Sequence, residues 1–225
     1  MMELPVQIPS AYGLVRGLYS KPKGCTDAVI LLPGLSGGAL SSRFRFISLA
    51  LAEAGIGCLS LEFSAYAKGG FDSYALINLL EELKGANAFL KADGIKNIGL
   101  VAKSFSGILA VLDWEDFKSL VLIAPTVFIK RKGMYDVDEI FKTEFGKLEI
   151  GKIGFTNAHL EEIKIPLRII HGTEDEVVDI RNSERIIKLC RGNLVVIVGA
   201  DHSFYLEEHK RDLASKVVEW FENSL

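Results

Sequence analysis

The feature that most constrains the fold is a repeated alternation between short apolar runs and segments of helical length. The apolar runs are rich in valine, isoleucine and leucine, as buried parallel strands are. They lie at Ala28–Leu32, Cys58–Phe63, Ile98–Val101, Leu120–Ala124, Leu167–His171 and Leu194–Val198. The intervening segments predict helices over Ser42–Ala54, Tyr74–Ala92, Ile108–Leu112, Ile180–Cys190 and Leu206–Asn223. This order predicts an α/β fold with a mostly parallel central sheet and helices on both faces.

The N-terminal part of the chain has a different pattern. Val6–Ile8 and Leu14–Tyr19 flank the sequence Ser-Ala-Tyr-Gly, which predicts an antiparallel hairpin. The chain of 225 residues suits a single domain over 1–225. Within it, residues 126–166 are predicted to form a short cap insertion. The aromatic residues of this insertion either line an acyl pocket or pack on the apolar face of a helix over Asp136–Phe145.

Composition argues against several classes of protein. A formal net charge of −3 gives no basic surface for nucleic acid or an anionic membrane. Three cysteines without a CxxC pair favour neither a zinc site nor a disulfide framework, and they suit a reducing compartment. No secretory leader is recognisable at the N-terminus, and no apolar run reaches the ~18 residues of a membrane helix. We therefore expect a cytoplasmic protein with no metal, cofactor, nucleic-acid or membrane partner.

The strand predicted at Ile98–Val101 leads into the sequence AKSFSG and then directly into a helical run. A serine between small residues at such a turn is typical of a nucleophile elbow, where a strained backbone lifts the hydroxyl out of the sheet. Ala102 and Ser106 stand where the usual pattern has glycines. Ser104 is therefore either the nucleophile of an elbow or an ordinary helix N-cap.

Three other loops follow predicted strands, and open parallel sheets place their sites at the carboxyl ends of strands. The loop PGLSGG either directs a backbone N–H at an oxyanion or forms a plain turn. The loop that begins HGTEDEVVD offers Glu174, Asp175 and Asp179 as carboxylates that could orient an imidazole. The loop GADHSF offers His202, whose side chain suits general base catalysis near neutral pH.

Ser104, Asp175 and His202 follow three different predicted strands in the order serine, acid, histidine, which is the order of the α/β-hydrolase triad. The chain resembles the α/β-hydrolase superfamily over almost its full length. AKSFSG stands where the family shows GHSxGG, HGTEDEVV resembles its acid motif and selects Asp175, and GADHSF resembles its histidine motif. The stretch RFRFISLALAEAGIGCLSLEFSAYAKG further resembles the cinnamoyl/feruloyl esterase-like and serine-aminopeptidase-like branch.

This resemblance implies a serine hydrolase that cleaves a small or medium carboxylic ester, or a related acyl bond, through an acyl-enzyme. It also implies oxyanion donors at the backbone N–H groups of Leu35 and Phe105, with a small-molecule acyl substrate as the partner and no cofactor. A binding protein or sensor on the same fold, with little turnover, remains an alternative. So does an acyltransferase, thioesterase or peptidase that uses the same triad.

The chain departs from the family at three polar positions. Pro33 stands where the family usually has the histidine of its HG motif, Lys103 stands at the elbow histidine, and Glu62 stands at the aspartate of a D-x-x-G turn. We expect either an ion pair between Lys103 and Glu62 that passes Pro33 and holds Lys103 away from Ser104, or two independently solvated charges.

Overall fold

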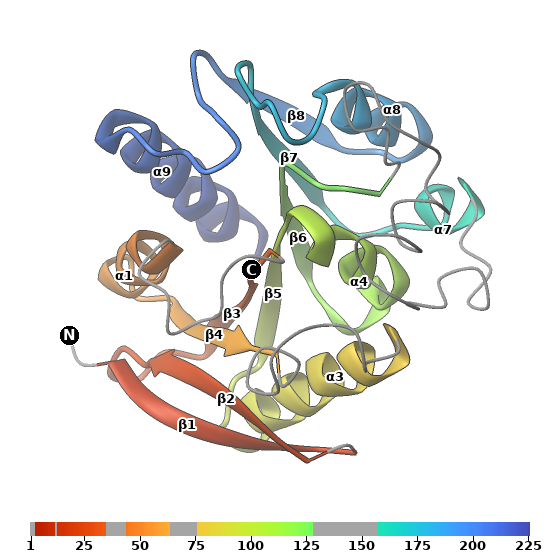
Figure 1. Ribbon diagram of the computed structural model, residues 1–225. Helices are drawn as coiled ribbons and strands as arrows, with labels where there is room; N and C mark the ends of the chain where they lie inside the picture. Colours follow the sequence, from red (N-terminus) through yellow and green to blue (C-terminus); the bar gives the residue numbers. More distant parts are fainter. Residues whose placement is uncertain (1–2, 12, 35–43, 64–75, 128–156) are drawn as a thin grey trace.

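The apolar runs of the sequence form the strands of one sheet in a computed structural model of the chain, which describes residues 3–11, 13–34, 44–63, 76–127 and 157–225. The sheet has eight strands in the order β1-β2-β4-β3-β5-β6-β7-β8 (Figure 1). Strands β3 to β8 are parallel, whereas β1 and β2 form an antiparallel hairpin that joins the sheet through β4. The strands span Glu3–Ser10, Gly13–Ser20, Asp27–Leu32, Gly57–Glu62, Asn97–Lys103, Ser119–Ile123, Leu167–Gly172 and Asn193–Ile197, for β1 to β8 in turn.

Helices cover both faces of this sheet. Helices α1 and α9 lie on one face, and α3, α4 and α8 lie on the other (Figure 1). The described helices are α1 (Arg45–Glu53), α3 (Leu76–Ala92), α4 (Gly107–Leu112), α7 (Asn157–Glu161), α8 (Arg181–Leu189) and α9 (Glu207–Ser224), with short 3-10 turns η2 (Ser104–Ser106) and η3 (Trp114–Asp116). The α/β architecture and the N-terminal hairpin predicted from the sequence are thus confirmed.

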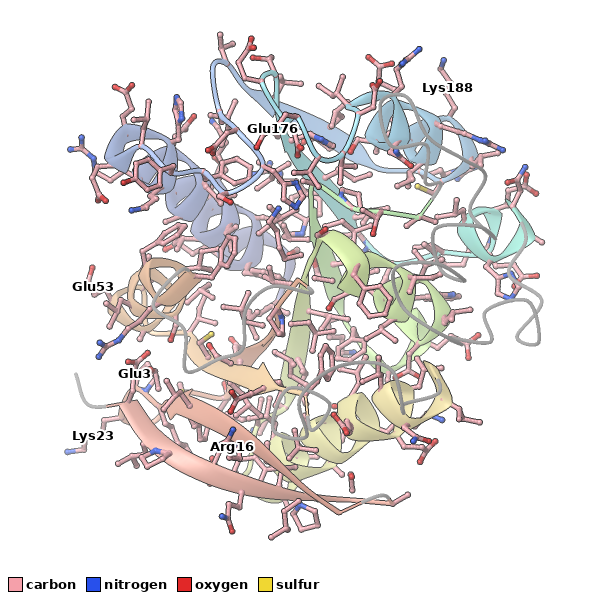
Figure 2. All side chains as sticks on the ribbon, viewed as in Figure 1. Glu3, Arg16, Lys23, Glu53, Glu176 and Lys188 are labelled. Atoms are coloured by element: carbon pink, nitrogen blue, oxygen red, sulfur yellow. The ribbon has the colours of Figure 1, made fainter. Side chains whose placement is uncertain are left out.

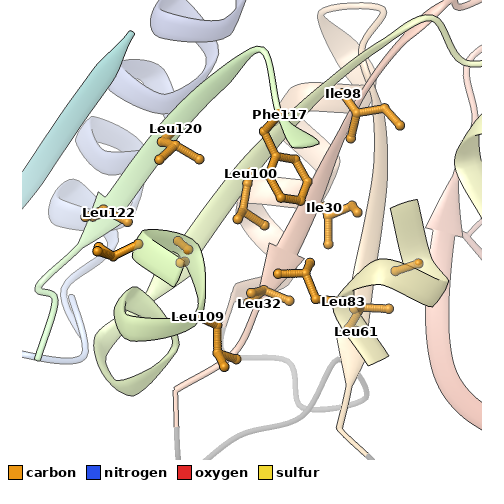
Figure 3. Packing of buried hydrophobic residues seen from close by; sticks show 14 of the residues in the cluster. Ile30, Leu32, Leu61, Leu83, Ile98, Leu100, Leu109, Phe117, Leu120 and Leu122 are labelled. Carbon is orange, nitrogen blue, oxygen red and sulfur yellow. The ribbon is translucent and has the colours of Figure 1, made fainter. Parts of the chain in front are cut away.

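The alternation of side chains along each strand divides the core into two layers. In β3, Val29 and Leu31 pack toward α1 and α9, whereas Ile30 and Leu32 pack toward α3 and α4. Figure 3 shows the second layer, in which residues of adjacent strands meet Leu83 of α3 and Leu109 of α4. Because both faces of β3 and β5 are buried, the polar groups of these strands emerge at the strand ends.

The cap insertion predicted over 126–166 lies largely outside the described residues, as do its predicted helix Asp136–Phe145 and most of its aromatic side chains. Within the insertion the structure describes Thr126 and Val127 and the chain from Asn157, which includes the short helix α7. In the described part of the chain, no helix is long and apolar enough to cross a membrane. Nor do three or more His, Cys, Asp or Glu side chains of that part gather in a way that could hold a metal ion.

Candidate active site

Ser104 lies immediately after β5, and its backbone has a φ of 52°. Lys103 before it is still extended, and the chain then turns through η2 into α4. Helix N-caps usually have extended backbone geometry, and the residue that precedes α4 here is Ser106, so Ser104 is not an N-cap. A left-handed serine between a strand and a helix is the geometry of a nucleophile elbow.

Small residues around the turn keep this strained conformation. A Cβ atom on Gly107 would lie 2.9 Å from the Cβ of Pro125, and one on Gly34 would lie 3.4 Å from the Cβ of Ser104. The backbone N–H of Thr126 donates to the carbonyl of Ser104 at 3.1 Å. The buried hydroxyl of Ser106 donates to the carbonyl of Pro33 and ties the turn to the loop after β3. Glycine is thus required at the start of α4, whereas Ser106 is accommodated because its hydroxyl bonds to the loop after β3.

His202 and Asp175 are in contact at the same edge of the sheet. The Nδ1 atom of His202 lies 2.7 Å from Oδ2 of Asp175. The other oxygen, Oδ1, accepts the backbone N–H groups of Val177 at 2.9 Å and Val178 at 2.7 Å. Since a carboxylate only accepts, Nδ1 carries the proton and Nε2 is left as the basic nitrogen.

The charge of Asp175 is stabilised by its hydrogen bonds. Burial would raise the pKa of this carboxyl, but hydrogen bonds from His171, His202 and the Val178 N–H, with the charge of His202, hold it well below its usual range. Of the other candidate acids, Glu174 is exposed and Asp179 is paired with Arg181 at 2.5 Å. The structure therefore favours Asp175 as the partner of the histidine.

His171, at the end of β7, is a further part of this site that was not among the residues predicted from the sequence. Its Nε2 atom lies 2.9 Å from the carbonyl of Val178 and 3.2 Å from Oδ2 of Asp175, and its Nδ1 lies 2.6 Å from Oγ of Ser183. Nε2 faces two acceptors and must carry the proton, so Nδ1 accepts from the serine. The signal was present in the sequence, because His171 opens the acid motif four residues before Asp175.

Backbone contacts hold the acid loop against the histidine loop. The N–H of Glu174 donates to the carbonyl of Ala200 at 3.0 Å, and the N–H of Thr173 donates to the carbonyl of Ile197 at 3.1 Å. A Cβ atom on Gly172 would lie 2.1 Å from the carbonyl oxygen of Ala200. The close approach of the two loops therefore requires glycine at position 172.

We expect Gly172→Ala to separate these loops and so to lower both stability and activity. The clash is with backbone atoms, which have no rotamer to relieve it, and overpacking of this kind costs ~1–3 kcal/mol. Chemical denaturation measures the loss of stability, and the rate of ester hydrolysis measures any loss of the activity expected from the sequence. A Gly172→Ala variant as stable and as active as the wild type would show that the loops are not locked at this point.

Neither expectation for Lys103 and Glu62 is correct, because they form no ion pair with each other and neither charge is independently solvated. Glu62 lies 2.9 Å from Arg16, which is its direct partner in the antiparallel pairing of β2 with β4. Lys103 is the last residue of β5, and β3 lies between β5 and the strand β4 that carries Glu62. The hairpin thus supplies a cation one strand away from Glu62, whereas Lys103 is two strands away; Figure 2 shows Arg16 on β2.

Lys103 instead contacts the histidine. Its side chain is buried, and its Nζ donates to the main-chain carbonyl of His202 at 2.7 Å. The same atom lies 3.3 Å from Nε2 and 3.5 Å from Nδ1 of the imidazole. Burial lowers the pKa of Lys103 to about 7, although the negative charges of Asp175, Asp201 and Glu176 act in the opposite direction. Burial also lowers the pKa of His202, although the hydrogen bond that its ring donates to Asp175 raises it, and the charge of Lys103 lowers it further.

Of the two predicted oxyanion donors, Phe105 follows Ser104 directly and buries its ring in the core, whereas Leu35 lies outside the described residues. Gly34, which precedes Leu35, lies against Ser104. The structure thus places Ser104, Asp175, His202 and Lys103 at the carboxyl ends of β5, β7 and β8.

Solved structures with the same fold cover nearly the whole chain. Est1E from Butyrivibrio proteoclasticus superposes with a TM-score of 0.81 at 17% identity and 98% coverage of both chains. Dienelactone hydrolase from Anabaena variabilis has a TM-score of 0.75 at 20% identity, with 100% of this chain and 98% of that one covered. The esterase Pf2001 from Pyrococcus furiosus has a TM-score of 0.78 at 19% identity, with 99% and 93% covered.

No protein-family model and no curated protein matches the sequence. The structural matches nevertheless cover almost the whole chain and show its fold. The chain has the α/β-hydrolase fold, and its structural neighbours are esterases and serine hydrolases of that fold.

Proposed function

We propose that the protein is a serine hydrolase that cleaves small or medium carboxylic esters through an acyl-enzyme. The observation that carries the proposal is the left-handed backbone of Ser104 at the carboxyl end of β5. Such a conformation costs a non-glycine residue ~1–3 kcal/mol, and residues held in it concentrate at functional sites. The contact between His202 and Asp175 at the same sheet edge supplies the base that a serine nucleophile needs.

In this mechanism Ser104 attacks the acyl carbonyl while Nε2 of His202 takes the hydroxyl proton. Asp175 stays ionised, keeps the Nδ1–H tautomer and stabilises the imidazolium. The backbone N–H groups of Leu35 and Phe105 stabilise the oxyanion. His202 then gives its proton to the leaving alcohol, and water repeats the sequence on the acyl-enzyme.

The structural neighbours favour ester substrates. Several are called esterases, and Est1E has also been solved with ferulic acid bound. We therefore expect turnover of p-nitrophenyl acetate, butyrate and octanoate, with methyl ferulate as the aromatic probe. The acyl chain at which kcat/KM is highest measures the length of the pocket.

A fluorophosphonate probe tests the nucleophile separately from the substrate. We expect it to label the wild type on Ser104, with mass spectrometry identifying the modified residue. Labelling without turnover of any of these esters would favour an acyltransferase, a peptidase or a slow sensor on the same fold. Absence of labelling would contradict a competent serine nucleophile and favour a binding protein.

A further inference from the structure

Lys103 is buried beside the residue that must act as the base. Only 3% of its surface is exposed, and its amine contacts His202 through both the main-chain carbonyl and the ring. The rings of Phe44 and Phe204 lie 5.9 Å and 5.7 Å from Nζ and exclude water on those sides. The amine therefore stays next to the imidazole in both protonation states, because the described residues around it leave no solvent-exposed position open to it.

The position of the amine around the ring is informative. A donor on the lone-pair axis of one ring nitrogen would lie much farther from the other nitrogen, yet Nζ is 3.3 Å from Nε2 and 3.5 Å from Nδ1. Nζ therefore lies over the ring or beside its Cε1 edge. The amine is therefore off the lone-pair axis of Nε2, the nitrogen that the proposed mechanism uses, while Nδ1 is bound by Asp175.

We propose that Lys103 is a positioning residue whose own proton controls His202: the side chain holds the histidine main chain in both states, and as an ammonium it opposes formation of the imidazolium. The proposal rests on the proposed function and extends it to the regulation of the site. The proton from Ser104 still goes to Nε2, and Lys103 neither gives nor takes a proton in the reaction. It acts through charge alone, at a separation where two positive charges repel strongly in a buried site.

The other charges around the pair do not cancel this effect. Asp175 and Glu176 from the loop after β7, and Asp201 from the loop after β8, stabilise the ammonium, and His171 adds a titratable ring beside Asp175. Asp175 is shared, because the same carboxylate binds Nδ1 of His202. The lysine and the histidine therefore compete for one counter-ion and titrate as a coupled pair.

This coupling predicts two rises in the pH profile of kcat/KM. The first rise follows loss of the His202 proton, and the second follows loss of the Lys103 proton, whose pKa is about 7. We expect the rate to increase about tenfold across the second rise, which corresponds to ~1.4 kcal/mol less opposition to the imidazolium.

Three substitutions separate charge from hydrogen bonding. Lys103→Met and Lys103→Gln remove the charge, so each should show a single rise, and only the glutamine keeps a donor for the His202 carbonyl. Lys103→Arg keeps a positive charge at every pH, so its kcat/KM should remain on the lower plateau. Lys118→Met is the control, because Lys118 is exposed and distant from the site, and it should keep both rises. A second rise that persists in Lys103→Met would overturn the proposal.

Nuclear magnetic resonance gives a readout that needs no turnover. The ring nitrogens of His202 should titrate at higher pH in Lys103→Met and Lys103→Gln than in the wild type, because a neighbouring positive charge has been removed. Thermal melts check that each variant is folded. An unchanged His202 titration in folded Lys103→Met would reject the coupling even if ester hydrolysis is confirmed. A shifted titration without any labelling of Ser104 would instead keep the coupling and reject the hydrolase.

Discussion

Ser104→Ala should lower kcat/KM for p-nitrophenyl esters by ~10⁴-fold or more, down to the rate that binding and the oxyanion donors alone can support. The substitution removes only the hydroxyl oxygen. Alanine still fits beside Gly34 and retains the left-handed turn, so the fold and the contact between His202 and Asp175 should survive. Initial rates at saturating and limiting ester separate a loss of kcat from a change in KM.

Ser10→Ala is the matched control for this experiment. It removes the same atom from a serine in the N-terminal hairpin, where the hydroxyl donates to the carbonyl of Gly13. We expect activity close to that of the wild type and full labelling by fluorophosphonate. Activity of Ser104→Ala within tenfold of the wild type would mean that hydrolysis does not pass through this serine.

The fold could be predicted from the sequence because its signals are local. Strand length and apolar content mark β3 to β8, and parallel strands buried on both faces require helices on either side. The boundaries in the structure differ by one or two residues at most strands; β5, for example, extends through Lys103 to the elbow. The order of Ser104, Asp175 and His202 along the chain is likewise a property of the sequence alone.

The side chains that pair with buried charges could not be predicted from local sequence signals. The pairing of Glu62 with Arg16 depends on β2 lying beside β4, and two strands that are distant in sequence give no local signal of their pairing. Lys103 and His202 are 99 positions apart in the chain and meet only because β5 and the loop after β8 end at one sheet edge. Side-chain partners at the site are therefore set by topology, which the spacing of motifs does not encode.

The positions of strained backbone conformations also depend on tertiary structure and could not be predicted from the sequence. Besides Ser104, the non-glycine residues with positive φ in the described ranges are Ala124 at the end of β6 and Phe204 two residues after His202. Nothing in the amino-acid types predicts a left-handed alanine or phenylalanine. All three lie in connections that follow strands of the parallel sheet, where the chain must leave the sheet abruptly around the site.

Asp175→Asn should lower kcat by ~10⁴-fold, because it forces the wrong tautomer on His202. The backbone N–H groups of Val177 and Val178 both point at Oδ1, so the amide oxygen of asparagine must occupy that position. The NH₂ group then replaces Oδ2 and donates toward Nδ1 of His202. The ring responds by placing its proton on Nε2, where it can no longer accept one from Ser104.

The same NH₂ group also faces the Nε2–H of His171, which the carbonyl of Val178 holds in place. Two donors then oppose each other in a buried site, so we expect a loss of ~1–3 kcal/mol in the free energy of unfolding as well. Asp179→Asn is the matched control, four residues away and paired with Arg181 near the surface. It should leave kcat near the wild-type value.

The pH dependence of this stability loss identifies its origin. The native pKa of Asp175 lies below its unfolded value, so the ionised carboxylate stabilises the fold above the usual carboxyl range and loses that effect as the pH falls through the native pKa. The difference in unfolding free energy between the wild type and Asp175→Asn should therefore shrink on acidification. A difference in unfolding free energy that stays constant with pH would assign the loss to packing. A difference that shrinks on acidification, with kcat still low, would show that the Asp175 carboxylate both stabilises these loops and selects the tautomer of His202.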